Sequence, residues 1–196
     1  MKQDFGAGRV ALLVIDVQKG LADPSHGERN NPQAEANMAT LLAAWRARQC
    51  PVIHIRHCST EPDSLLRPEL PGNAFKDEVR PLDFETVIEK QVNSAFIGTG
   101  LEQYLHEIGC PRLVIVGLTT DHCVSASTRM ASDLGFDVIL VSDATAAFER
   151  TGFDGRYYSG DEIHRVNLVS LDREFCQVRS TREVLANIGS PNPEPA

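Results

Sequence analysis

Three runs of almost continuous apolar, β-branched residues restrict most strongly what this chain can fold into. The runs are "RVALLVIDVQ" (9–18), "PRLVIVGLTT" (111–120) and "FDVILVSDAT" (136–145), and each ends in polar residues. "PVIHIRH" (51–57) has the same character, and "ETVIEK" (85–90) is a shorter example. Strands that are apolar on both sides are typical of a parallel sheet covered by helices on both faces. We therefore expect such a sheet in this chain.

Segments with helical periodicity separate these strands. Residues 33–49 and 99–109 repeat apolar side chains at helical spacing, and a third such segment follows Cys123. Strands and helices that alternate in this way form βαβ units. The pattern predicts an α/β fold, a three-layer α/β/α sandwich with a Rossmann-like parallel sheet. We expect one domain over residues 1–189 and a disordered tail over 190–196.

The charge and the cysteine content narrow the range of partners and compartments. A formal net charge of -8 argues against nucleic acid and anionic membranes as partners. The five cysteines are an odd number without CxxC spacing, which favours a reducing compartment over a disulfide framework. The N-terminus lacks the apolar run of a signal peptide, and no apolar run is long enough to span a bilayer. We expect a cytoplasmic protein.

Three reactive side chains follow predicted strands at their carboxyl ends, where ligands bind in open parallel sheets. Asp16 ends the first strand, Lys90 ends the short strand, and Cys123 follows the strand at 111–120. Each alone has a common structural explanation, as a turn acid, a solvated lysine or a small buried side chain. Together they are chemically consistent, because a cation and a helix N-terminus stabilise a thiolate and a carboxylate can accept the thiol proton. We therefore expect Asp16, Lys90 and Cys123 to form one reactive site.

Three blocks in this order, "LLVIDVQKG", "EKQVNSAFIGTGLEQYL" and "LVIVGLTTDHCVSASTRMASDLGFDVILVSDAT", resemble the isochorismatase-like superfamily of cysteine hydrolases. That superfamily includes nicotinamidases, N-carbamoylsarcosine amidohydrolases, and biuret and ureidoacrylate hydrolases. The resemblance implies that Asp16 is the general base, Lys90 the triad lysine and Cys123 the nucleophile. It also implies a cis peptide bond between Leu118 and Thr119, and an oxyanion hole formed by the backbone N–H groups of Thr119 and Cys123.

The resemblance covers residues 9–180 and implies a function. True isochorismatases lack the cysteine, so Cys123 favours hydrolysis of a C–N bond in a small amide, carbamoyl or ureide substrate through a thioester intermediate. No cofactor is expected, and relatives of this kind are commonly homodimers or homotetramers. Two alternatives stay open: a metal-assisted, nicotinamidase-type amidase, and a catalytically silent scaffold with the same fold.

Four further residues are candidates for the substrate pocket. Gln18 lies two residues beyond Asp16, where it would orient Asp16 or the substrate. His57 stands at the carboxyl end of a strand. Phe96 matches an aromatic residue that often lines the pocket in the superfamily, and His122 is a candidate for the pocket wall. Each also has an ordinary alternative, as a strand-end polar residue, a strand-end histidine, a core phenylalanine or a surface histidine.

His54 and His57 raise the question of a metal site. Residues three apart on a strand point to opposite faces of the sheet, and no Asp precedes a His here at the spacing typical of nicotinamidases. The sequence therefore predicts no metal ligand. The irregular, proline-containing segment 58–83 is expected to serve as a lid or a substrate loop.

Overall fold

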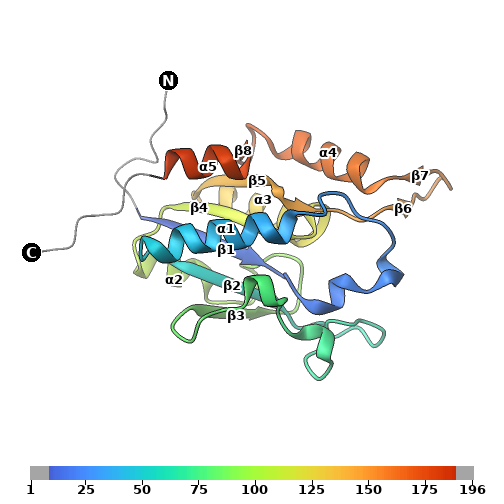
Figure 1. Ribbon diagram of the computed structural model, residues 1–196, viewed down its shortest axis with the longest axis horizontal. Helices are drawn as coiled ribbons and strands as arrows, with labels where there is room; N and C mark the ends of the chain where they lie inside the picture. Colours follow the sequence, from blue (N-terminus) through green and yellow to red (C-terminus); the bar gives the residue numbers. More distant parts are fainter. Residues whose placement is uncertain (1–8, 189–196) are drawn as a thin grey trace, which may run out of the picture.

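The computed structural model describes residues 9–188, in which six strands form one sheet in the order β3-β2-β1-β4-β5-β8 (Figure 1). Every neighbouring pair in this sheet is parallel. The strands are β1 (Val10–Ile15), β2 (Val52–His57), β3 (Thr86–Lys90), β4 (Arg112–Leu118), β5 (Asp137–Ala146) and β8 (Gln177–Arg179). The tail predicted at 190–196 lies outside the described residues.

Helices cover both faces of this sheet. One face packs against α1 (Ala34–Ala47) and α5 (Thr181–Asn187). The other packs against α2 (Leu101–Glu107), α3 (Ser125–Asp133) and α4 (Gly160–Leu171). The predicted three-layer α/β/α sandwich with a Rossmann-like parallel sheet is confirmed. Within residues 9–188, no helix combines the length and the apolar character needed to cross a membrane.

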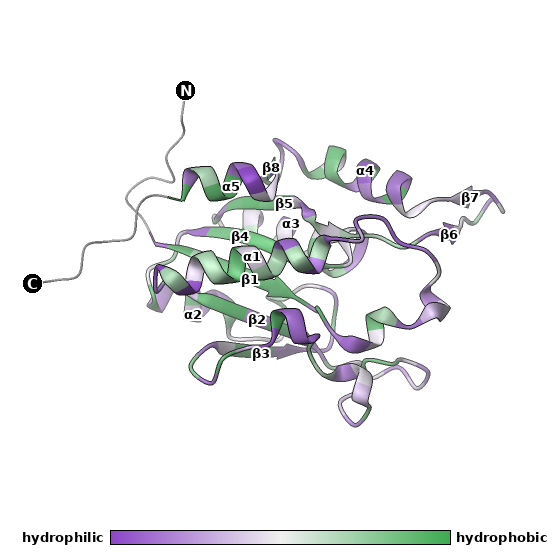
Figure 2. Cartoon of the chain, viewed as in Figure 1, coloured by the Kyte–Doolittle hydropathy of each residue, from purple (hydrophilic) through white to green (hydrophobic). Residues whose placement is uncertain are grey.

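The two faces of β1 explain why its sequence is apolar without alternation. Leu12 and Val14 belong to the core beneath α1, whereas Leu13 and Ile15 belong to the core on the opposite side. All four are fully buried, so both sets of side chains add apolar contact area. In Figure 2 the central strands are mostly green, whereas the helices on either side alternate between green and purple.

The end of β4 lies unusually close to the end of β1. A Cβ atom on Gly117 would lie 2.1 Å from the Ile15 carbonyl oxygen, which no side chain can tolerate. Gly117 also has a φ of +134°, in a region that favours glycine. The glycine therefore allows the two strands to deliver their following residues to the same place.

Some elements were not predicted from the sequence. The short edge strand β8 is one, and the hairpin of β6 (Arg150–Thr151) and β7 (Tyr157–Tyr158) is another. The helix that follows the hairpin, α4, begins with a capping box in which Ser159 and Glu162 satisfy each other's backbone N–H groups. In Figure 1 the hairpin extends beyond the rest of the molecule.

Candidate active site

The candidate site lies where the strand order changes direction. β1 and β4 are neighbours in the sheet but are not consecutive in the chain, and such a switch point is where open parallel sheets bind ligands. Asp16 directly follows β1, and Cys123 lies in the turn after β4. Lys90 is the last residue of β3, two strands from β1. Its long side chain reaches the other two.

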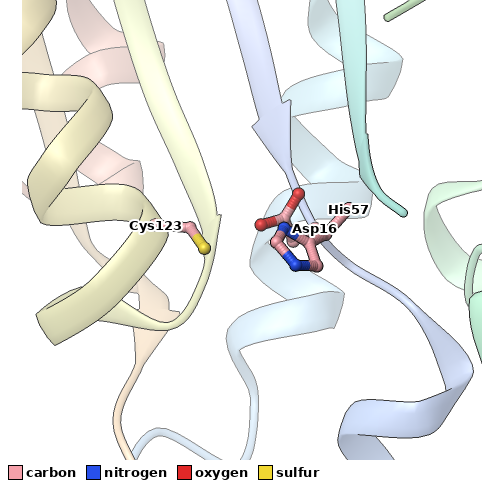
Figure 3. Close-up of side chains that lie close together, drawn as sticks. All are labelled: Asp16, His57 and Cys123. Carbon is pink, nitrogen blue, oxygen red and sulfur yellow. The ribbon is translucent and has the colours of Figure 1, made fainter. Parts of the chain in front are cut away.

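Lys90 lies at the centre of a cluster that it forms with Asp16, His57 and Cys123. Its Nζ lies 2.6 Å from Asp16 Oδ2 and 3.3 Å from Cys123 Sγ. It also donates to His57 Nδ1 at 2.9 Å and to the Val92 carbonyl oxygen at 3.1 Å. Figure 3 shows Asp16, His57 and Cys123 facing one another, and their reactive atoms all lie within 4.8 Å. The structure thus brings the three predicted triad residues together and adds His57.

Exposure differs sharply between the members of this cluster. The side chains of Lys90 and Asp16 are 0% and 2% exposed, whereas Cys123 and His57 are partly exposed. A substrate can therefore reach Cys123 and His57 while the ion pair stays behind them. A side-chain hydrogen bond joins the buried Asp16 carboxylate to the Cys123 thiol, so the carboxylate is placed to receive the thiol proton.

Burial governs the acidity of these groups. Burial, and then the negative charge of Asp16, raise the pKa of the Cys123 thiol to about 12 against the opposing charge of Lys90. Burial also raises the pKa of Asp16, although Lys90 opposes this. Burial, and then the charge of Lys90, lowers the pKa of His57 to about 4. A buried site with one cation favours a single anion, so Asp16 and Cys123 compete for the negative charge beside Lys90.

The turn that carries Cys123 has an unusual backbone. The peptide bond between Leu118 and Thr119 is cis, the isomer that the resemblance implies. Residues Thr120–Val124 then form one π-helical turn, in which the N–H groups of His122 and Val124 both donate to the Thr119 carbonyl oxygen at 3.2 Å. Cys123 therefore precedes α3 instead of lying within it, and α3 begins at Ser125.

The side chain of Gln18 bonds to the backbone of His57, whereas its backbone N–H donates to the Asp16 carbonyl oxygen at 2.9 Å. Its carboxamide accepts the His57 N–H at 2.9 Å and donates to the His57 carbonyl oxygen at 3.0 Å. The same amide group donates to the Asn73 carbonyl oxygen at 2.9 Å. Gln18 is fully buried, so these bonds fix the backbone of His57 beside Lys90.

The segment 58–83 is anchored next to the site. Buried Asn73 donates to the carbonyl oxygens of His57 at 2.9 Å and Leu66 at 2.7 Å. At Gly72 a Cβ atom would lie 2.4 Å from the Leu65 carbonyl oxygen. These contacts anchor the segment beside His57, and its role as a lid or a substrate loop stays a prediction.

Among the described residues, the side chains of Phe96 and His122 make their ring and polar contacts with residues other than Asp16, Lys90 and Cys123. Phe96 is a core residue whose ring centroid is 5.9 Å from that of Phe136. His122 is exposed, with Nε2 3.1 Å from the Arg150 guanidinium and 3.4 Å from Asp121. Both positions match the ordinary alternatives considered for these residues.

Asn93 is a site residue that the sequence analysis did not identify. Its Oδ1 lies 3.6 Å from Cys123 Sγ, and the residue is exposed. Its position in the sequence, three residues after Lys90 on the loop that follows β3, could have indicated that it lies near the site. An exposed amide beside the thiol can offer a donor and an acceptor to a substrate.

The residues present do not fit a resident metal ion. Among the described residues, the one group of three metal-ligand side chains close enough together is Asp16, His57 and Cys123. The Lys90 ammonium group occupies the space among them, at hydrogen-bonding distance from each. His54 is buried elsewhere, with Nε2 3.0 Å from Glu85 Oε2. The two histidines therefore do not form one site.

Comparison with known proteins gives consistent matches. The isochorismatase domain model matches residues 10–183. The uncharacterized isochorismatase family protein YrdC of Bacillus subtilis is 46% identical over 175 residues, which are 89% of this chain and 94% of the relative. A crystal structure from Chromobacterium violaceum, assigned to the hydrolases of the isochorismatase family, has a TM-score of 0.92 and 50% identity, covering 95% of this chain and 97% of that one. Maleamate amidohydrolase of Pseudomonas putida is 28% identical over 203 residues, covering 95% of this chain and 90% of the relative.

Proposed function

This chain belongs to the isochorismatase family of hydrolases, and we propose that it uses Cys123 to cleave a C–N bond in a small amide, carbamoyl or ureide substrate. The predicted family and the prediction of a hydrolase are confirmed. The observation that carries the finer proposal is the contact of one buried ammonium group, Lys90, with both Asp16 and Cys123. The activity of the relative named maleamate amidohydrolase is consistent with it.

The first step is a proton transfer inside the cluster. Asp16 takes the thiol proton of Cys123, and the single negative charge moves from oxygen to sulfur without leaving the neighbourhood of Lys90. Lys90 has three N–H groups and four neighbouring acceptors. Once Asp16 is neutral its attraction for Lys90 weakens, so an N–H of Lys90 is released for the thiolate. The thiolate is therefore formed and stabilised in one exchange.

The thiolate then attacks the substrate carbonyl carbon, and the C=O electron pair moves to oxygen. The backbone N–H groups of Thr119 and Cys123 stabilise this oxyanion in the proposed mechanism; a donor of this kind contributes about 3–4 kcal/mol in other hydrolases. Protonated Asp16 gives its proton to the departing nitrogen, the C–N bond breaks, and a thioester remains on Cys123.

Water completes the reaction. Asp16, again a carboxylate, removes a proton from a water molecule that attacks the thioester carbonyl carbon. The C–S bond breaks, the carboxylic acid leaves, and the proton returns to the Asp16–Cys123 pair. One water is consumed for each acid and each ammonia or amine released, and no other co-reactant is needed.

The pH dependence of thiol alkylation tests this mechanism without a known substrate. Each cysteine is alkylated with iodoacetamide at several pH values and followed by peptide mass. We expect the Cys123 rate to be nearly constant from about pH 5 to 9, because the proton moves within the pair. The rate at Cys50, an ordinary thiol whose pKa burial raises, should rise about tenfold per pH unit.

Lys90→Ala is the matching variant, because it removes the cation that stabilises the thiolate. The constant rate at Cys123 should then be lost. A wild-type Cys123 rate that rises with pH like that of Cys50 would reject the proposal and favour the silent scaffold. Ammonia release from a panel of small amides and ureides, with and without a chelator, then defines the substrate and tests the metal-assisted alternative.

We also propose a homo-oligomer, one functional domain and a reducing compartment. The exposed apolar residues Val166 and Val169 on α4 and Phe153 on the β6–β7 hairpin support the oligomer. All five cysteines are free, which is consistent with the cytoplasm. The oligomer is tested by the mass in solution, and the compartment by fractionation of cells that express the protein.

A further inference from the structure

A buried polar contact connects α4 to the turn that carries the nucleophile. His164 on α4 is 6% exposed, and its Nδ1 lies 2.8 Å from the Thr120 hydroxyl oxygen. Thr120 is fully buried and lies directly after the cis peptide unit, three residues before Cys123. Of the twelve residues of α4, only Gly160, His164 and Leu171 are buried. A polar ring thus takes one of the few inward positions on this helix.

We propose that His164 is a positioning residue that, through Thr120, holds the turn whose backbone N–H groups stabilise the oxyanion. This inference rests on the proposed function, because it assigns an oxyanion hole to Thr119 and Cys123. His164 itself contacts none of the reacting groups. Its effect on chemistry would therefore pass through the backbone of the turn.

A second set of contacts holds the other side of the His164 ring. Nε2 lies 3.4 Å from Asn31 Nδ2. Asn31 Nδ2 also donates to the carbonyl oxygens of Ser142 at 2.9 Å and Thr145 at 2.7 Å. Ser142 lies in the part of β5 where the register with β4 shifts, and Thr145, which pairs with Gly117, directly follows that part. Both N–H groups of Asn31 are thus used by these carbonyls, and the ring lies between this part of β5 and the Thr120 turn, with the bond to Thr120 as its short contact.

The chemistry of the ring suits a fixed contact. Burial lowers the pKa of His164 from its usual value, so the imidazole is neutral near pH 7 and offers one donor and one acceptor. A threonine hydroxyl group can donate or accept, so a good bond to Nδ1 exists for either tautomer. Two buried polar groups that lose this bond would each lack a partner, which gives the contact a directional role beyond filling space.

A shift of the Thr120 turn should affect the backbone oxyanion donors more than the Cys123 thiol. A displacement of about 1 Å in a catalytic group can cost about 10²-fold in rate. The Thr119 carbonyl oxygen already accepts two N–H groups of the same turn, so a shift at Thr120 would change the direction of its neighbouring amides. Cys123 Sγ is held independently by Lys90.

Two reagents separate these effects without requiring the natural substrate. Acylation of Cys123 by p-nitrophenyl acetate forms a C–S bond through a tetrahedral oxyanion and releases p-nitrophenolate. Alkylation by iodoacetamide displaces iodide at a saturated carbon and forms no oxyanion. The ratio of the acylation rate to the alkylation rate at Cys123 therefore reports on the oxyanion hole, and both reactions are assigned to Cys123 by peptide mass.

We expect His164→Leu and Thr120→Val each to lower this ratio about 10- to 100-fold, with the alkylation rate within about threefold of wild type. The double variant should be no worse than the poorer single variant, since both remove one contact. Thr120→Ser keeps the hydroxyl group and should keep most of the ratio. Arg165→Ala, which changes an exposed residue of the same helix, is the matched control.

Several outcomes would overturn the proposal. One is an unchanged ratio in Thr120→Val, which nearly preserves the volume and so remains informative if His164→Leu fails to fold. Others are additive losses in the double variant, or a parallel fall in acylation and alkylation, which would mean that the ring positions the thiol. If wild-type Cys123 lacks pH-independent alkylation, the proposed function fails instead, and the two failures are distinguishable.

Discussion

Asp16 makes the Cys123 thiol less acidic, yet the proposed reaction requires Asp16. Its negative charge helps to raise the pKa of the thiol, yet it is the group that must take the thiol proton and return it to the leaving nitrogen. In Asp16→Asn we therefore expect alkylation of Cys123 near neutral pH to become at least about tenfold faster, because Lys90 then stabilises the thiolate alone. Amide hydrolysis should fall by about 10²- to 10⁴-fold, because no group carries the proton.

Both effects are measured on one preparation, by peptide-mapped alkylation and by ammonia release. Asp63→Asn, at an exposed position outside the cluster, is the control and should change neither rate. If alkylation and hydrolysis fell together in Asp16→Asn, the charge of Asp16 would not be what keeps Cys123 protonated, and the shared-proton mechanism would be wrong.

The three residues at strand ends were predictable because parallel strands bring their carboxyl ends to one edge. The contact of Lys90 with His57, by contrast, depends on the backbone bonds from Gln18, which no local pattern in the sequence indicates. Asn93 was missed for a similar reason. Its position beside Cys123 is set by the path of the loop after β3, and loop paths have no periodicity from which to predict them.

At the scale of elements, one carboxylate connects three segments around the site. Glu35 in the first turn of α1 contacts Arg29 from the preceding loop and Lys76 from segment 58–83; its Oε1 is 2.7 Å from Arg29 and 2.5 Å from Lys76. Burial opposes ionisation of Glu35, but the hydrogen bonds from Arg29 and Lys76 lower its pKa to about 2. The carboxylate thus stabilises the folded arrangement of all three segments while it is charged.

The sign of the pH dependence follows from this lowered pKa. The contribution of Glu35 to stability is fully present above its unfolded pKa of 4.5 and is lost as the pH falls toward about 2. The shift corresponds to about 3 kcal/mol at neutral pH. Glu35→Gln should therefore lower the free energy of unfolding by up to this amount at pH 7, and the difference from wild type should shrink between about pH 4.5 and 2.

Urea unfolding of both proteins across this pH range measures the effect. The control is Glu102→Gln, on the exposed side of α2. Glu183→Gln would not serve, because Glu183 caps α5. A Glu35→Gln penalty that stayed constant down to about pH 2 would mean that packing, and not charge, holds the segments. From sequence alone Glu35 is an ordinary acid in a first turn, since both of its partners are supplied by tertiary structure.

The elements that could be predicted are those with long apolar runs or clear helical periodicity. The strands β1, β4 and β5 are fully buried over most of their length, so burial alone fixes their composition. β8 has three residues, none of them fully buried, and pairs with β5 over a short register. Such an edge strand is defined by its neighbour in the sheet and leaves little pattern of its own.

At the scale of the whole molecule, the region of α4 and the β6–β7 hairpin leaves apolar side chains uncovered. Val166 and Val169 on α4 are 68% and 74% exposed, and Phe153 on the adjoining β6–β7 hairpin is fully exposed. A two-stranded hairpin is marginally stable on its own in water, and an apolar group of this kind commonly marks a protein–protein interface. These features favour a second copy of the chain as the cover for α4 and the hairpin.

Light scattering coupled to size exclusion tests this directly. Wild-type protein should have a multiple of the 21.5 kDa chain mass, and Val169→Glu should shift it toward the monomer, because burying an unpaired carboxylate in an apolar interface is costly. Phe84→Glu, at an apolar residue 82% exposed beside β3, should leave the mass unchanged. A monomeric wild type would contradict the oligomer. Dissociation by Phe84→Glu, with the oligomer intact in Val169→Glu, would place the interface elsewhere.

The oligomer and the active site can be connected through α4, because this helix also carries His164. If α4 needs a second copy of the chain to hold the Thr120 turn, loss of the oligomer should lower the rate of acylation of Cys123.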